Sequence, residues 1–243
     1  MLNIYFKELI SFFSSLIGYV VIAIFLLFLG LIIWVFPDYS ILYYYYATLD
    51  QLFEISPMVF LFLIPAITMR SFSEEKQSGT LELLQTKPLT SWDIVLGKYF
   101  ASLTLVIFAL IPTVLYYYTV HNLGSPPGNI DAGAVLGSYI GLILLAAAFT
   151  AIGVLASALS SNQIVSFLLA AFICFILFWG FLFLSKLPGV VGTWDVFIQW
   201  LGLDYHYQRI SQGLIDTRNV IYLLSVTVLF LLIATNKLET EKS

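Results

Sequence analysis

Uncharged runs of apolar residues alternate with short polar stretches along the whole sequence. A helix needs about 20 apolar residues to cross the hydrocarbon layer of a membrane, where only an internally hydrogen-bonded backbone is tolerated. Six runs are candidates for such helices, at about residues 15–36, 55–69, 99–120, 133–156, 164–185 and 219–236. The pattern therefore predicts an all-α integral membrane protein with six transmembrane helices.

Two features of these runs indicate where the chain bends or turns. The second run is short and contains Pro57 and Pro65, so we expect a kinked helix there. Residues 132–185 carry no charge over 54 positions, which is too long for a single crossing. The polar segment SALSSNQ, at residues 157–163, marks a turn. The fourth and fifth spans are therefore expected to form a hairpin.

The composition agrees with a membrane protein and excludes other classes. The chain is 60% hydrophobic and 10% charged, whereas soluble domains carry about 25% charged residues. The sequence has no basic patch that would bind nucleic acid. The single cysteine, Cys174, allows no intrachain disulfide, and His121 and His206 have no ligand-spaced partner with which to hold a metal.

The distribution of lysine and arginine predicts the orientation of the chain. Six spans place both termini on one side, and that side holds seven of the ten basic residues: Lys7, Arg70, Lys76, Lys87, Lys98, Lys237 and Lys242. The opposite side holds Lys186, Arg209 and Arg218. Because the cytoplasmic side is enriched in basic residues, we expect cytoplasmic N- and C-termini. The six spans predict a multi-pass protein, and the single cysteine is consistent with an inner membrane.

Two segments outside the spans have an amphipathic pattern. Residues 1–14 are expected to form a helix in the membrane interface, and a frayed terminus is the alternative. Residues 186–218 form a long external loop whose apolar residues recur at helical spacing, so we expect it to lie against the membrane. Asp216 or Thr217 can serve as the N-cap of the last span.

Residues 70–98 form a segment rich in charge that cannot lie in hydrocarbon. The second span is expected to continue as a helix through residues 70–77. It should end at Ser78 and Gly79, because glycine readily adopts the left-handed conformation at helix C-termini. Thr80 then caps a second short helix. We name residues 70–98 the elbow, a helix–break–helix segment that projects from the membrane.

The second half of the elbow leads back to the membrane. Lys87 and Pro88 are expected to close the short helix, because the residue before proline avoids helical angles. Thr90 or Ser91 should cap the next helix, with Asp93 in its first turn, and this helix continues into the third span. A solvated loop that merely joins two spans is the alternative for the whole elbow.

The chain lacks the residue patterns of a catalytic or ion-coupled site. No predicted span carries paired carboxylates, a histidine cluster or an ionisable group at mid-membrane. Gly97 and Lys98 resemble the end of a phosphate-binding loop, but Tyr99 replaces its Ser or Thr and Trp92 replaces its first Gly. We expect Gly97 and Lys98 to allow close packing and to anchor the third span. The chain is thus expected not to be an enzyme, and energy for any driven work must come from another subunit.

Motifs in the elbow resemble those of a known family. They are Arg70-x-Phe72-x-x-Glu75, Gly79-Thr80-x-Glu82-x-Leu84 and the later residues Pro88, Ile94, Gly97 and Lys98. In this pattern the chain is similar to ABC-2 type permeases, the membrane subunits of ABC transporters. The resemblance covers nearly the whole chain and implies a single transmembrane domain, residues 1–243, with the ABC-2 (type V exporter-like) permease fold.

The resemblance also implies partners. In such systems two permease chains pair, each beneath a cytosolic ABC ATPase that binds ATP and magnesium, so no cofactor is expected on this chain. The elbow receives motion from the ATPase. The residues implied in that coupling are Arg70, Glu74, Glu75, Gly79, Thr80, Glu82 and Leu84.

Three other segments, IGYVVIAIFLL, FLIPAITMRSFSEEKQSGTLELLQTKPL and LSSNQIV, resemble gliding-motility permeases of the GldF type. That likeness implies a GldA-like ATPase and, as second membrane subunit, a GldG-like protein or another permease copy. The alternatives are a membrane anchor through which an ABC-type ATPase does mechanical work on the envelope, and an ABC-2 permease for a lipid or for copper-site maturation.

Overall fold

The computed structural model describes residues 1–43, 46–85, 89–189, 192 and 194–242. The described residues form helices, turns and loops without a strand. The α-helices are α1 Leu2–Phe13, α2 Leu16–Trp34, α3 Asp50–Thr68, α4 Arg70–Gln77, α5 Thr80–Gln85, α6 Ser91–Leu110, α7 Val114–Leu123, α8 Ala132–Leu159, α9 Gln163–Phe175, α10 Phe181–Ser185, α11 Asp195–Trp200, α12 Leu203–Ser211 and α13 Thr217–Lys242.

Five helical stretches within the described residues are long and apolar enough to cross a membrane. They are Asp50–Gln77, Ser91–Leu123, Ala132–Leu159, Gln163–Ser185 and Thr217–Glu241. A sixth is obtained if α1 and α2 count as one broken span, although these two helices meet at an angle of 70°. The all-helical membrane architecture predicted from the sequence is confirmed, with five or six spans.

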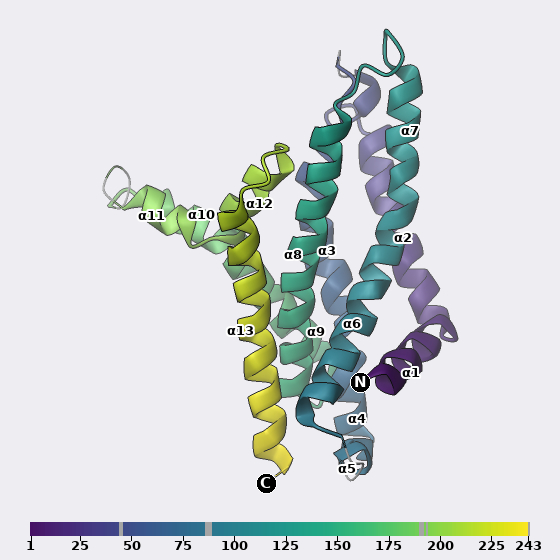
Figure 1. Cartoon of the computed structure of the whole chain (residues 1–243), viewed down its shortest axis with the longest axis vertical. Coiled ribbons are helices and arrows are strands. Elements are labelled where there is room, and N and C mark those ends of the chain that lie inside the picture. Colours follow the sequence, from purple (N-terminus) through teal and green to yellow (C-terminus); the bar gives the residue numbers. More distant parts are fainter. Residues whose placement is uncertain (44–45, 86–88, 190–191, 193, 243) are drawn as a thin grey trace.

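Helix α8 lies at the centre of the bundle and contacts α3, α6, α9, α12 and α13 (Figure 1). Its small residues explain this position, because they let neighbouring helices approach closely. At Gly153 the approach is closest: a Cβ there would lie 2.1 Å from Oγ1 of Thr68 on α3. The hairpin of α8 and α9 is confirmed as the sequence predicted it.

Two predicted boundaries are wrong. Helix α8 continues to Leu159, so the turn is shorter than residues 157–163, and the side chain of Asn162 caps α9 by accepting from the backbone of Ile164 and Val165. Helix α13 continues to Lys242, so the helix extends through residues 237–242, beyond the expected end of the span at 236. Charged residues are good helix formers once a preceding helix supplies the nucleus, which explains the extension.

The external loop, residues 186–218, contains the short helices α11 and α12, and the short α10 precedes it at the end of the stretch Gln163–Ser185. Figure 1 shows α10 and α11 projecting sideways from the bundle, while α12 packs beside α13. The ring of His206 is buried and bonded at both nitrogens, to Oδ1 of Asn219 at 2.8 Å and to the carbonyl of Trp200 at 2.9 Å. Asp216 accepts a bond from the backbone of Arg218, so the predicted cap of the last span is confirmed.

Both termini lie toward the end of the bundle that carries α4 and α5 (Figure 1). Helix α1 is formed as expected for residues 1–14, and it packs against α6. The contact depends on Gly97, where a Cβ would lie 2.9 Å from the Cβ of Ile4. The close packing that we expected at Gly97 is therefore confirmed, with α1 as the neighbour.

Candidate functional site

The elbow begins at a break between α3 and α4. Met69 separates the two helices, and the hydroxyl of Ser157 on α8 lies at this break. The hydroxyl donates to the carbonyl of Met69 at 3.0 Å and accepts from the backbone amides of Phe72 at 2.9 Å and Ser73 at 3.1 Å. One buried side chain of the central helix thus holds the start of α4.

The tip of the elbow has the geometry that the sequence predicts. Helix α4 ends at Gln77, and Gly79 has a φ angle of +69°, which favours glycine. Helix α5 starts at Thr80 itself, so Thr80 is not the preceding cap that we expected. Its hydroxyl instead bonds with the hydroxyl of Ser78 at 2.9 Å and donates to the carbonyl of Glu75 at 3.4 Å.

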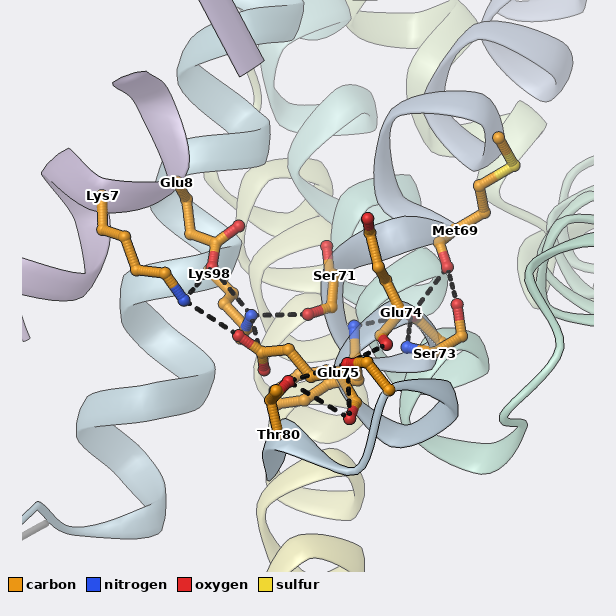
Figure 2. A network of polar contacts seen from close by, with 12 residues as sticks. Lys7, Glu8, Met69, Ser71, Ser73, Glu74, Glu75, Thr80 and Lys98 are labelled. Carbon is orange, nitrogen blue, oxygen red and sulfur yellow. Dashed lines mark hydrogen bonds and ion pairs between the residues drawn. The ribbon is translucent and has the colours of Figure 1, made fainter. Parts of the chain in front are cut away.

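A network of charges holds the first half of the elbow to its neighbours (Figure 2). Lys98 of α6 is only 1% exposed, and its Nζ lies 2.8 Å from Oε1 of Glu8 on α1 and 3.0 Å from Oε2 of Glu75 on α4. The same ammonium donates to the carbonyl of Ser71. Lys7 of α1 lies 3.1 Å from Oε1 of Glu75. We name Lys7, Glu8, Glu75 and Lys98 the charge cluster.

The charge cluster balances two cations against two carboxylates. A buried ammonium is costly in a low-dielectric environment unless opposite charges and hydrogen bonds compensate it, and here Lys98 has both. Its ammonium also lies 5.1 Å from the ring centre of Phe72, at cation–π distance. Because the four residues come from α1, α4 and α6, these three helices cannot separate without exposing an unpaired charge.

The C-terminal helix holds α4 from another side. Nζ of Lys76 lies 2.7 Å from Oε1 of Glu241 on α13 and also donates to the carbonyl of Ala158 on α8. Lys237 lies 3.2 Å from the same carboxylate oxygen. Buried apolar residues of α1, α4, α6, α8 and α13 also pack together in one cluster. Four helices thus fix the position of α4.

The structure places the described coupling residues predicted from the sequence in three different settings. Glu75 points inward into the charge cluster, with 14% of its side chain exposed, so it is not one of the charges that the elbow presents to solvent. Gly79, Thr80 and Glu82 are exposed at the tip. Arg70 and Glu74 form an i,i+4 ion pair at 3.7 Å along α4.

Two predicted features fall outside the described part of the chain. The first is the side chain of Leu84. The second is the pair Lys87 and Pro88, which we expected to close the short helix. The start of α6 is described and is confirmed. Thr90 accepts from the backbone of Asp93 and the Asp93 side chain accepts from Thr90, a complete capping box.

Sequence reasoning did not identify Ser157, Glu8 and Glu241 as parts of this site, and it treated Lys98 only as an anchor. A signal for Lys98 was present, because a lysine that continues directly into an apolar helix needs a counter-charge. No local pattern names that partner, since Glu8 and Glu75 are separated from Lys98 by 90 and 23 positions.

The comparisons with known proteins agree with this architecture. The family model for ABC-2 family transporter proteins matches residues 37–235, which extend from just after α2 into α13 and include the whole elbow. A search of curated proteins finds no match. The family match covers most of the chain and implies an ABC ATPase as partner. The chain therefore belongs to the ABC-2 family of transporter proteins.

Proposed function

We propose that the chain is the membrane-spanning permease subunit of an ATP-driven, exporter-type ABC complex. In this proposal a separate cytosolic ATPase binds and hydrolyses ATP with magnesium and docks at the elbow. Both termini and the elbow are cytoplasmic, and the spans lie in a bacterial inner membrane. A second copy of this chain or another membrane subunit completes the pathway.

One observation carries the proposal: the exposed tip of the elbow follows α4, a helix that is bonded to four other helices. Gly79, Thr80 and Glu82 are exposed, whereas α4 is bonded to α1, α6, α8 and α13. A loop that only joined two spans would not need this network. A force applied to α5 is passed through α4 to several spans at once, which is what a coupling element requires.

The left-handed conformation of Gly79 ends α4 and lets the chain change direction before α5. A Cβ at this position would meet no atom within 4 Å, so the requirement for glycine comes from backbone conformation and not from crowding. The exposed carboxylate of Glu82 lies in the first turn of α5, where it is available to a basic residue of the ATPase. Arg70, Glu74 and Leu84 complete the proposed coupling set.

The narrower proposal is that the complex supports gliding motility. It is based on the segments that resemble GldF-type permeases, and it names a GldA-like ATPase and a GldG-like membrane protein as partners. A mechanical anchor without transport, or a permease for a lipid or for copper-site maturation, would use the same elbow. Purifying the complex and measuring what crosses the membrane with and without ATP separates these alternatives.

Changing the tip is expected to uncouple the complex. Gly79→Val forces a β-branched residue into the left-handed region, at a cost of about 1–2 kcal/mol, and Glu82→Lys reverses the exposed charge. In purified complexes, each variant should lower permease-stimulated ATPase activity at least about threefold, equivalent to roughly 0.7 kcal/mol of coupling. The membrane fold should stay intact, because neither side chain is buried.

Matched controls are available on the same chain. Gly192 also has a positive φ angle, +85°, and a Cβ there would meet no atom within 4 Å, but it lies in the external loop, so Gly192→Val should leave coupling unchanged. Glu239→Lys is the control for Glu82→Lys, because it reverses another exposed charge at the same end of the bundle as the elbow. Normal ATPase stimulation and normal co-purification of the ATPase in both tip variants would contradict the proposed docking site.

A further inference from the structure

Two adjoining cavities lie at the end of the bundle away from the elbow. The larger has a volume of about 880 Å³ and lies between α2, α3, α12 and the π-helical segment Ile176–Gly180 that follows α9. The smaller, about 720 Å³, lies between α10, α12 and the start of α13. Both are lined by Phe178, Asp204, Gln208 and Gln212. We name the larger one the outer cavity.

The lining of the outer cavity combines negative charge with apolar surface. Its carboxylates are Asp50 and Glu54 of α3 and Asp204 of α12, and none of its described lining residues is lysine or arginine. Apolar and aromatic residues such as Phe28, Met58 and Trp179 line much of the rest of the wall, beside the polar residues Gln208, Ser211 and Gln212. A cavity of this size with a few convergent polar groups is typical of a small-molecule site.

Asp204 is the most buried of the three carboxylates, since Asp50 and Glu54 are exposed. It is only 7% exposed, and both of its oxygens accept from the Gln208 amide, at 3.0 and 3.1 Å. The described part of the chain gives it no salt bridge. Burial raises the pKa of this carboxyl, and the Gln208 bond and the more distant charge of Lys186 offset the rise only in part. Burying a carboxylate without a cation is unfavourable, so a bound cation would relieve it.

The nearby cations are engaged elsewhere or are distant. The guanidinium of Arg209 lies 4.7 Å from the ring centre of Tyr205, and both residues line the smaller cavity. Lys186 acts on Asp204 only through the electrostatic attraction between their opposite charges. The aromatic wall adds a second attraction for a positive charge, because the faces of aromatic rings attract cations, including the quaternary ammonium groups of ligands.

The outer cavity also reaches the exposed apolar surface of the spans. Phe28 of α2 is 48% exposed and Met58 of α3 is 47% exposed, and both line the cavity. An apolar chain can therefore extend from the cavity along these side chains into the hydrocarbon layer. An amphipathic cation would match both kinds of surface. Its positive head group would lie at Asp204, and its apolar tail would lie along Phe28 and Met58.

We propose that the outer cavity binds amphipathic cations, molecules with an ammonium head group and a long apolar tail. The inference deepens and rests on the proposed function, because it names the chemical class of substrate for the permease. Asp204 and Glu54 hold the head group, and the wall formed by α2 and α3 holds the tail. Lipid amines and soluble amphiphilic amines share this chemistry.

The test measures binding to the purified chain in neutral detergent, without the ATPase. Radiolabelled hexadecyltrimethylammonium should bind saturably, and binding should fall about tenfold or more in Asp204→Asn, because a buried charge partner is lost. Glu54→Gln should weaken binding by a smaller factor. Asp38→Asn, which neutralises an exposed carboxylate outside both cavities, should leave binding unchanged.

Four competitors complete the experiment. Tetramethylammonium, which has no tail, should compete at least about tenfold more weakly, and hexadecyl sulfate should not compete for the same sites. An amine-headed lipid that competes in mixed micelles points to a lipid source, whereas a soluble long-chain amine that competes alone points to a free amphiphile. Either result supports the inference.

Other outcomes overturn it. Equal competition by hexadecyl sulfate would show that the charge of the head group is not recognised, and unchanged binding in both Asp204→Asn and Glu54→Gln would place binding elsewhere. Because Glu54 is exposed, its variant remains informative if Asp204→Asn fails to fold. Binding can fail while the elbow variants still uncouple the ATPase, so the inference and the proposed function fail separately.

Discussion

Replacing Lys98 with methionine is expected to destabilise the protein and to uncouple the elbow. The change keeps the length of the side chain but leaves Glu8 and Glu75 without their shared cation. Loss of one member of a buried ion pair costs about 3–5 kcal/mol, and the partial exposure of the two carboxylates places the expected loss at the lower end. The midpoint of thermal unfolding of the detergent-purified protein should fall by several degrees, which fluorescence-detected size-exclusion chromatography measures.

Two companion variants separate charge from packing. Lys237→Met removes a lysine that is 39% exposed, and the expected change is small because surface ion pairs contribute about 0–1 kcal/mol. The double variant with Lys98→Met and Glu75→Gln keeps Lys7 and Glu8, whose opposite charges cancel. Part of the thermal stability lost in Lys98→Met should therefore return. If the double variant is no more stable than Lys98→Met alone, the charge cluster does not act through charge balance.

Replacing Ser157 with alanine is expected to loosen the start of α4. The variant loses the three bonds that the hydroxyl makes with Met69, Phe72 and Ser73. Each hydrogen bond contributes roughly 0.5–1.5 kcal/mol, so the break between α3 and α4 should open more often. Hydrogen–deuterium exchange followed by mass spectrometry should show amide exchange in residues 69–77 faster by about tenfold, equivalent to roughly 1.4 kcal/mol.

Ser166 provides the matched control for this experiment. It is also fully buried, but its hydroxyl returns to the carbonyl of Asn162 one turn before it, so Ser166→Ala removes no bond between helices. Exchange in residues 69–77 should stay unchanged in that variant. Equal exchange in wild type and Ser157→Ala would show that Ser157 does not hold α4, and the coupling path through α8 would have to be abandoned.

The two variants act on different connections of the same helix. Lys98 ties α4 to α1 and α6, and Ser157 ties it to α8. We expect both to lower the stimulation of the ATPase, since a force on α5 then moves α4 without moving the spans. The tip variants differ from them, because they interrupt contact with the ATPase and leave α4 in place. Comparing the two pairs distinguishes failure of docking from failure of transmission.

Local features of the elbow could be predicted from the sequence because their causes lie within a few residues. Gly79 ends a helix through its own backbone freedom, and Thr90 and Asp93 cap α6 across three positions. The spans were predictable for the same reason, since hydropathy over about 20 residues decides whether a segment enters a membrane. The errors were at ends, as in the extension of α13 to Lys242.

The role of Glu75 shows where local reasoning fails. Its neighbours in sequence are charged and polar, which favours an exposed position, yet the structure turns it toward Lys7 and Lys98. A residue on a short helix faces whatever the rest of the fold packs against that helix. That choice depends on where α1 and α6 lie, and no property of residues 70–77 specifies it.

The sequence by itself determined an all-helical membrane protein, the approximate spans, the elbow and its glycine hinge, because each follows from hydropathy, helix capping or backbone conformation over a short stretch. Only the tertiary structure decided which faces meet: Lys98 with Glu8 and Glu75, Ser157 with the break at Met69, Lys76 with Glu241, and Asp204 with the outer cavity. The physical reason is that these contacts join residues far apart in the chain, and their partners are set by helix packing.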